Sequence, residues 1–320
     1  MLYLAVMSLQ KERQNAIKRL RTFLFTSKTD IQQYRRRIDE AFSETFLPNR
    51  VELEERTFDG VACDVIRPEM YSTDRLMIYV HGGSFIAGSR LAYRSFVSSL
   101  ANACSCVAIV PEFRLAPAFP FPFSVNDIQS VFRCVYTERM HKAFAVEEEG
   151  GDARMPEILI AADTSGASIA LGFLLNLKAK FRKAIKRVIL FSPWLDISED
   201  NSKIMTRRGG DDVFTSESVR LCAENYATPE KRNTPLVSPL LATEEQFEAF
   251  PEVYMQMGGR EMFLDEAREF EGKLSSMGIG CTLDVWKDMM PLFQMADDSL
   301  AESHLAVEKI GRMVTARDDE

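Results

Sequence analysis

The sequence from residue 157 to residue 177 is Glu157-Ile-Leu-Ile-Ala-Ala-Asp-Thr-Ser-Gly-Ala-Ser-Ile-Ala-Leu-Gly-Phe-Leu-Leu-Asn-Leu177. Residues 158–161 form a short apolar run, whose length and branching predict a fully buried strand. Small residues fill 162–168, and the nearly unbroken apolar segment 169–177 predicts a helix that is buried on most sides. A strand, a tight turn of small residues and a buried helix are typical of a nucleophile elbow.

The elbow pattern is G-x-S-x-G, in which the residues two before and two after the nucleophile are small because the backbone there is strained. Ala162 and Gly166 fit these two flanking places, and Thr164 takes the place of the nucleophile. Centring the pattern on Ser165 instead would put Asp163 in a flanking place. The sequence therefore predicts the scaffold of an elbow without its serine.

The composition is that of an ordinary globular protein. The chain has 320 residues, of which 46% are hydrophobic and 27% charged, so it can form one large or two small domains with a substantial core. Its net charge of -8 argues against a nucleic-acid partner.

Six cysteines are scattered along the chain without zinc-ligand spacing, so we expect free thiols, no metal site and a reducing compartment. No apolar run reaches about 18 residues, the length that a membrane span needs. The apolar start, 1–7, lacks a basic residue before it and is not interpreted as a signal peptide. These features together predict a cytoplasmic protein.

The N-terminal segment, residues 1–47, reads as one or two amphipathic helices. It carries nine basic and five acidic residues, so its net charge is +4 while the rest of the chain is -12. One interpretation is a solvated helical segment packed on an acidic body. The alternative is a membrane-surface helix that uses the apolar start and the run Phe23, Leu24 and Phe25.

The rest of the chain predicts an α/β protein. Residues 51–66 form a hairpin signal across Asp59-Gly60, and apolar runs afterwards alternate with helical segments. We therefore expect a mostly parallel central sheet with an antiparallel N-terminal hairpin and helices on both faces. The other expected strands are 76–80, 106–110, 158–161, 187–191, 253–256 and 282–286; the helices include 93–103, 125–136, 216–226 and 265–277; and 141–156 reads as an acidic loop.

Several segments, in this order, resemble the hormone-sensitive-lipase-like family of α/β-hydrolases, over roughly residues 48–310. The resemblance implies an α/β-hydrolase domain at 48–320, a small helical cap over the active site at 1–47, and carboxylesterase or lipase chemistry without a cofactor. The matching segments are His81-Gly82-Gly83-Ser84-Phe85, Phe113-Arg114-Leu115-Ala116-Pro117, the elbow, Ser192-Pro193-Trp194-Leu195-Asp196, Val237-Ser238-Pro239-Leu240, and Gly258-Gly259-Arg260-Glu261 with Asp265-Glu266.

Acyl transfer needs hydrogen-bond donors aimed at the developing oxyanion. The glycines Gly82 and Gly83 allow the backbone to approach a ligand, and the residue after the nucleophile, Ser165, adds another N–H group. We expect His81 to fix this loop by hydrogen bonding rather than to act as a base.

The triad positions are degenerate. Thr164 has a hydroxyl, but its β-branching raises the cost of the strained elbow backbone. The resemblance places the acid at Glu261 and the base at Pro291, which cannot accept a proton. His141 and His304 are expected on the surface.

Two classes of function follow. The first is a pseudo-hydrolase that binds a small acyl-like or hydrophobic ligand, or a partner protein. The second is a weakly active carboxylic-ester hydrolase that uses Thr164 and the oxyanion loop Gly82-Gly83. Weak membrane-surface contact through 1–47 and a homodimer are left open.

Overall fold

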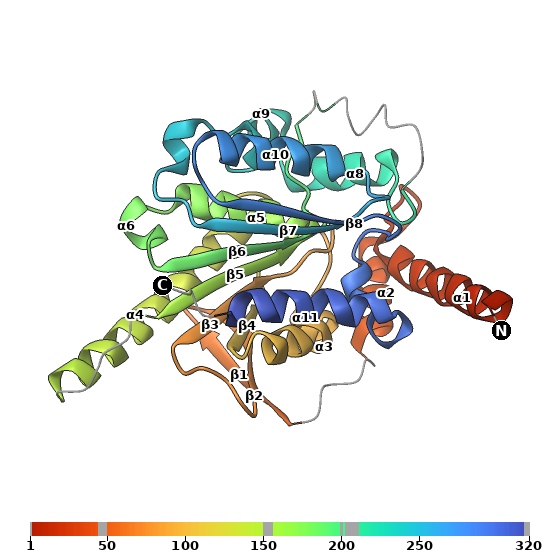
Figure 1. The fold of residues 1–320 in the computed structure, drawn as a ribbon. Coiled ribbons are helices and arrows are strands. Elements are labelled where there is room, and N and C mark those ends of the chain that lie inside the picture. The colour runs from red at the N-terminus through yellow and green to blue at the C-terminus, as the bar shows by residue number, and fades with distance from the viewer. Residues whose placement is uncertain (1, 44–49, 150–155, 199–200, 202–210, 317–320) are drawn as a thin grey trace.

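Eight strands form one sheet in the computed structural model, which describes residues 2–43, 50–149, 156–198, 201 and 211–316 (Figure 1). The strand order is β1-β2-β4-β3-β5-β6-β7-β8. The β1–β2 and β2–β4 pairs are antiparallel and all later pairs are parallel, as the sequence predicts. The strands are β1 Val51–Phe58, β2 Val61–Pro68, β3 Arg75–Val80, β4 Val107–Pro111, β5 Glu157–Asp163, β6 Ile185–Phe191, β7 Glu252–Gly258 and β8 Cys281–Trp286.

Helices cover both faces of the sheet (Figure 1). Helices α3 (Arg90–Ala103) and α11 (Ala301–Thr315) pack together on one face. Helices α4 (Phe123–Glu148), α5 (Thr164–Asn176) and α10 (Leu264–Ser276) cover the other. The remaining helical segments are α6 Ala179–Arg182, α8 Ser216–Tyr226, α9 Pro229–Arg232, η2 Pro239–Leu241, η3 Glu244–Phe247 and η4 Phe293–Ser299.

One expectation about the helices is wrong. The acidic loop expected at 141–156 is helical as far as Glu148, because α4 continues for twelve residues beyond the predicted end at Tyr136. Residues 137–148 include three glutamates, two alanines and one each of arginine, lysine and methionine, which are good helix formers, so the helix propagates without a signal to stop. The rest of that expected loop, 150–155, lies outside the described residues.

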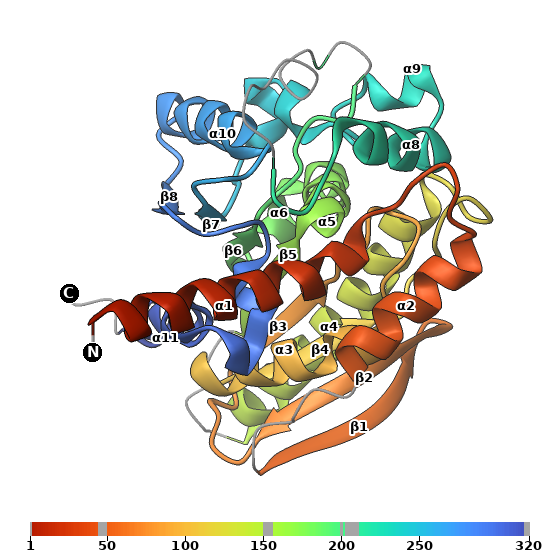
Figure 2. The ribbon, with the colours of Figure 1, turned by 90° about the vertical axis from the view of Figure 1, so that its right-hand side faces the viewer.

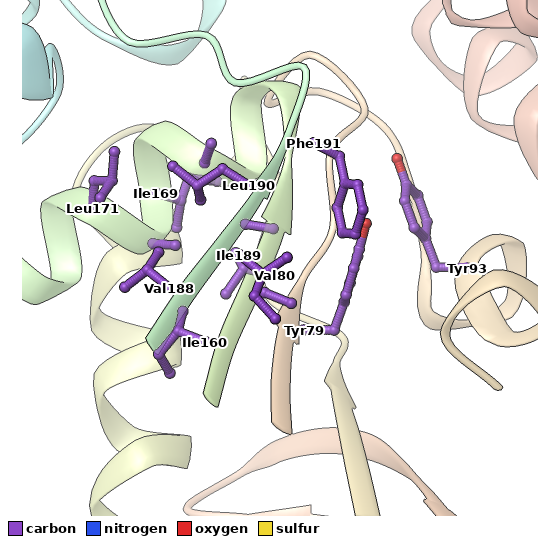
Figure 3. Close-up of a cluster of buried hydrophobic side chains, with 14 of the residues drawn as sticks. Tyr79, Val80, Tyr93, Ile160, Ile169, Leu171, Val188, Ile189, Leu190 and Phe191 are labelled. Atoms are coloured by element: carbon purple, nitrogen blue, oxygen red, sulfur yellow. The ribbon is translucent and has the colours of Figure 1, made fainter. Parts of the chain in front are cut away.

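Buried apolar side chains fill the space between the central strands and α5. Figure 3 shows Val188 and Leu190 of β6 directed toward α5, while Phe191 points to the opposite face, toward Tyr93. This alternation follows from the two-residue period of a strand. From Val188 to Phe191 both faces of β6 are therefore buried, as the continuous apolar run predicts.

The N-terminal segment forms two helices at the edge where the parallel strands end (Figure 2). These are α1 (Leu2–Leu20), followed by the short η1 (Arg21–Phe23), and α2 (Ile31–Ser43). Phe23 is 1% exposed, Phe25 is buried and Leu24 is half-buried. The run 23–25, one of the two apolar parts that a membrane-surface helix would use, is thus packed against the protein, while the side chains of the apolar start, 1–7, lie outside the described residues. None of the described helices is long and apolar enough to cross a membrane.

Specific hydrogen bonds hold this segment on the body. The Phe25 N–H donates to Ser218 Oγ of α8 at 3.2 Å. The Arg35 guanidinium donates to the carbonyl oxygens of Ile86 and Ala116, at 2.8 and 3.0 Å. Because both carbonyls belong to loops beside the elbow, α2 is fixed next to the candidate site. The assignment of 1–47 as a separate cap domain stays a prediction.

We expect Phe23→Ala to lower the free energy of unfolding by about 3–5 kcal/mol, because it removes a fully buried ring. Phe144→Ala is the matched control, since that ring on α4 is 54% exposed and its loss should change stability by less than about 0.5 kcal/mol. Urea titration monitored by circular dichroism measures both. Equal effects of the two substitutions would contradict the packing described here.

Candidate active site

Thr164 lies at the turn from β5 into α5, with a φ of +42° in the left-handed region and a side chain that is 4% exposed. The backbone is so closely packed here that a Cβ on Gly166 would come within 2.2 Å of the Val80 carbonyl oxygen. A Cβ on Gly82 would come within 2.2 Å of Thr164 Oγ1. The elbow geometry and its need for small neighbours are therefore as the sequence predicts.

A buried carboxylate, which the sequence interpretation missed, lies directly beside the elbow. Asp163 accepts hydrogen bonds from the Tyr79 and Tyr93 hydroxyls, both at 2.9 Å, and from the Gly82 N–H at 2.8 Å. It also accepts from Thr164 Oγ1 at 3.1 Å. Burial raises the pKa of Asp163 to about 6, although these hydrogen bonds oppose the rise. The Thr164 hydroxyl is thus held by a carboxylate and not by an imidazole.

His81 fixes the glycine loop, as expected. Its Nδ1 donates to the Gly82 carbonyl oxygen at 2.8 Å, since a carbonyl can only accept. The ring is stacked between Phe113 and Tyr93, at centroid distances of 4.2 and 5.3 Å. Burial lowers the pKa of His81 to about 4, so the imidazole is neutral and structural.

The oxyanion assignment changes at one position. The Gly82 N–H donates to Asp163, so it is not available to a ligand. In the described part of the chain, the N–H groups of Gly83 and Ser84 donate to no protein acceptor. Ser165 is in the first turn of α5, where N–H groups have no acceptor within the helix. Gly83 and Ser165 stay predicted donors, and Ser84 replaces Gly82.

Glu261, the residue at the acid position, belongs to a second hydrogen-bonded network. Glu261 is fully buried and accepts from Ser192 Oγ at 2.8 Å and from the Gly258 N–H. Ser192 Oγ in turn accepts from the Leu292 N–H at 3.0 Å. Since Leu292 follows Pro291, the acid and base positions are brought together, with the Ser192 hydroxyl between the acid and the base loop. Sequence reasoning missed this role of Ser192.

The sheet order explains why these positions meet. β5, β6, β7 and β8 are consecutive neighbours, and parallel strands end at the same edge, so the loops carrying Thr164, Glu261 and Pro291 lie along that edge. All three histidines of the chain are described, and none hydrogen-bonds to Thr164. His141 on α4 and His304 on α11 are exposed, as expected.

Glu266, five residues beyond the acid position, is a further buried acid. Its Oε2 accepts from the Leu195 and Asp196 N–H groups at 3.0 and 3.1 Å, and its Oε1 accepts from Asn201 Nδ2 at 2.6 Å. Burial raises the pKa of Glu266 to about 8. The carboxyl group thus orders the loop after β6 at a pH where an ordinary glutamate is ionised.

This raised pKa predicts that stability falls as pH rises. The pKa of Glu266 has its ordinary value near 4.5 in the unfolded state and is about 8 in the folded state. Between these two values the folded state binds a proton that the unfolded state has lost, so the free energy of unfolding falls as the pH rises to about 8. From pH 6 to 8 we expect the free energy of unfolding to fall by about 2 kcal/mol through this group. Asp163 and Asp211, with pKa values near 6, contribute mainly below that window.

Urea unfolding at pH 6, 7 and 8, with wild-type protein and Glu266→Gln, measures this difference. The variant keeps a side chain of the same shape but has no proton to lose, so its fall in stability over this range should be smaller by about 2 kcal/mol. Identical pH dependence in the two proteins would contradict the assignment.

The fold and this constellation define a class of protein. A strand-turn-helix elbow, a glycine loop facing it and an acid after β7 are the arrangement of an esterase-type α/β-hydrolase. The model of the family described as alpha/beta hydrolase fold matches residues 77–295, and the chain belongs to this family, as a member of the hormone-sensitive-lipase type.

Similar proteins are named as esterases. The chain is 25% identical to an esterase of Acinetobacter venetianus over 260 residues, which are 81% of the chain and 80% of the relative. It is 25% identical to an acetyl-hydrolase of Streptomyces hygroscopicus over 74% of each chain. A crystal structure of an esterase from the bacterial hormone-sensitive lipase family matches with a TM-score of 0.82 and 25% identity, covering 95% of this chain and 97% of that one.

Proposed function

We propose that this α/β-hydrolase is a pseudo-hydrolase, which binds a small acyl-containing ligand at the elbow without turning it over efficiently. The observation that carries the proposal is the hydrogen bond of the Thr164 hydroxyl, which goes to Asp163 and not to a base with a triad's geometry. Proline stands at the base position, 291, and the chain's other two histidines outside the glycine loop are exposed.

The backbone N–H groups and aromatic rings beside the elbow support the binding of a ligand. The N–H groups of Gly83, Ser84 and Ser165 supply donors at a helix N-terminus, an arrangement that suits a carbonyl or carboxylate oxygen. Phe85, which follows Ser84 and whose N–H donates to Ser165 Oγ at 3.0 Å, brings a buried aromatic ring that stacks on Tyr226 at a centroid distance of 4.0 Å. Polar donors on an apolar background are what an acyl group requires.

A weakly active ester hydrolase is the second candidate. Thr164 Oγ1 lies 3.1 Å from Asp163, close enough for direct proton transfer, and the relatives named above are an esterase and an acetyl-hydrolase. However, that carboxylate already accepts three other hydrogen bonds, which stabilise its ionised form and weaken it as a base.

A thermal-shift titration with butyrate and ethyl butyrate tests the binding proposal, because a ligand that binds only the folded state raises the melting temperature. Gly83→Ala should abolish the shift, since its φ is +110° and a Cβ there would lie 2.1 Å from the Ala87 carbonyl oxygen. Gly272→Ala is the matched control, because nothing lies within 4 Å of its added Cβ. An unchanged shift in a folded Gly83→Ala variant would contradict binding at the elbow.

A further inference from the structure

We propose that the chain has a second ligand site, a pocket between the N-terminal hairpin and α4, which takes a small amphiphile with an apolar chain and a single negative charge. Its cavity volume is about 210 Å³. It lies at the opposite end of the sheet from the elbow. Leu76 lines it near the start of β3, whereas His81 follows the end of that strand, about 15 Å farther on.

The floor of this pocket is apolar and comes from five different elements. Phe58, Val65 and Ile109 belong to β1, β2 and β4, and each is only 2–3% exposed. Leu76 of β3 and Val135 of α4 complete one side and are similarly buried. Helix α4 contacts β1 and β2, and its residues Val135, Arg139 and Lys142 form one wall of the pocket. This floor suits an alkyl chain, which gains about 0.8 kcal/mol per buried methylene group.

Two arginines of the rim are already neutralised. Arg56 pairs with Glu138 at 2.9 Å, and its guanidinium lies 4.6 Å above the centre of the Phe58 ring. Arg67 pairs with Glu54 at 2.6 Å. These ion pairs hold the arginine side chains in place, and they leave little charge for a ligand.

The unbalanced charge comes from α4. Arg139 and Lys142, three residues apart on one face of the helix, both line the pocket. Arg139 donates to the Thr73 carbonyl oxygen and is attracted by Asp74. Lys142 is exposed and forms no ion pair with any described residue. The four basic residues of the lining face three acids, which are Glu138 in the lining and Glu54 and Asp74 just outside it. The rim therefore has a net charge of +1, although the whole chain carries -8.

An apolar floor with one excess cation at its mouth matches a monoanionic alkyl carboxylate. The methylene groups would lie on the strands and the carboxylate beside Lys142 and Arg139. The pocket is smaller than the roughly 300–1,000 Å³ of drug-sized ligand sites, so the chain of the ligand is short.

Titration calorimetry with octanoate, below its micelle concentration, tests this proposal. We expect saturable binding that weakens at high salt, and weaker binding of octan-1-ol, which lacks the charge. Lys142→Glu should weaken octanoate binding about three- to tenfold, because an exposed attraction becomes a repulsion. Lys183→Glu, at the exposed lysine that directly follows α6, is the matched control and should leave the affinity unchanged.

Three outcomes would overturn the second site. They are no saturable heat with octanoate, equal weakening by Lys142→Glu and Lys183→Glu, or equal affinity for octanoate and octan-1-ol. Binding that Gly83→Ala abolishes and Lys142→Glu leaves intact would also overturn it, because that result places the carboxylate at the elbow. The proposal is therefore separable from the proposed function.

Discussion

The double variant Thr164→Ser with Pro291→His should hydrolyse p-nitrophenyl butyrate about 100-fold faster than wild type, since general-base catalysis typically contributes 10²–10⁴-fold. Each single change should be nearly silent. A serine hydroxyl is a poor nucleophile until a base takes its proton, and a base is useless without a competent nucleophile. Members of a triad act as a unit, so repairing one of two defects recovers little.

The structure adds a condition to this result. The new imidazole must reach Glu261, whose Oε1 already accepts from Ser192. Removing that hydroxyl in the triple variant with Ser192→Ala should therefore raise the rate further. Thr164→Ser with Pro291→Ala is the matched control, since it removes the proline ring without supplying a base. Equal rates for the histidine and alanine versions would contradict the assignment of residue 291 as the base position.

Asp163→Ala should lower the free energy of unfolding by about 3–5 kcal/mol, because it leaves several buried donors without an acceptor. The Tyr79 and Tyr93 hydroxyls and the Gly82 N–H all depend on this carboxylate. Each buried unsatisfied group costs about 1–3 kcal/mol. Loss of the carboxylate also frees the glycine loop from the elbow, so ligand binding should weaken with stability.

Asp163→Asn is the control for this experiment. Its amide oxygen can still accept from Tyr79 and Gly82, so it should cost clearly less than the alanine variant in urea unfolding. A stability loss below about 1 kcal/mol for Asp163→Ala would show that the network contributes little. The role assigned to Asp163 would then be wrong.

The fold could be predicted from the sequence because its elements have strong local signals. The Asp59-Gly60 turn has both φ angles positive, at 48° and 84°, as a tight hairpin requires. Helix α8 spans Ser216–Tyr226, the range that the sequence predicts. Helix α4 was underestimated because its exposed C-terminal turns carry charged residues, and charge alone does not separate a solvated helix from a loop.

The site could be predicted only in part, because its motif positions are local and its hydrogen bonds are not. Thr164, Glu261 and Pro291 follow from resemblance to short motifs. Asp163, in contrast, accepts a hydrogen bond from Tyr79, which lies 84 residues earlier in the chain. A contact between residues so far apart cannot be predicted from a periodic pattern in the sequence. The same holds for Ser192 and its partner Glu261, which are 69 residues apart. The signal that could have identified Asp163 is an acid placed directly beside the nucleophile position, in a segment that is otherwise apolar or small.

The turnover number of purified wild-type protein on p-nitrophenyl butyrate tests the central claim most directly. Because Thr164 has no histidine base, we expect a rate barely above the buffer blank and unchanged by Thr164→Val, which keeps the β-branched shape but removes the hydroxyl. A turnover of about 1 s⁻¹ or faster, near ordinary enzyme rates and abolished by Thr164→Val, would contradict the pseudo-hydrolase proposal.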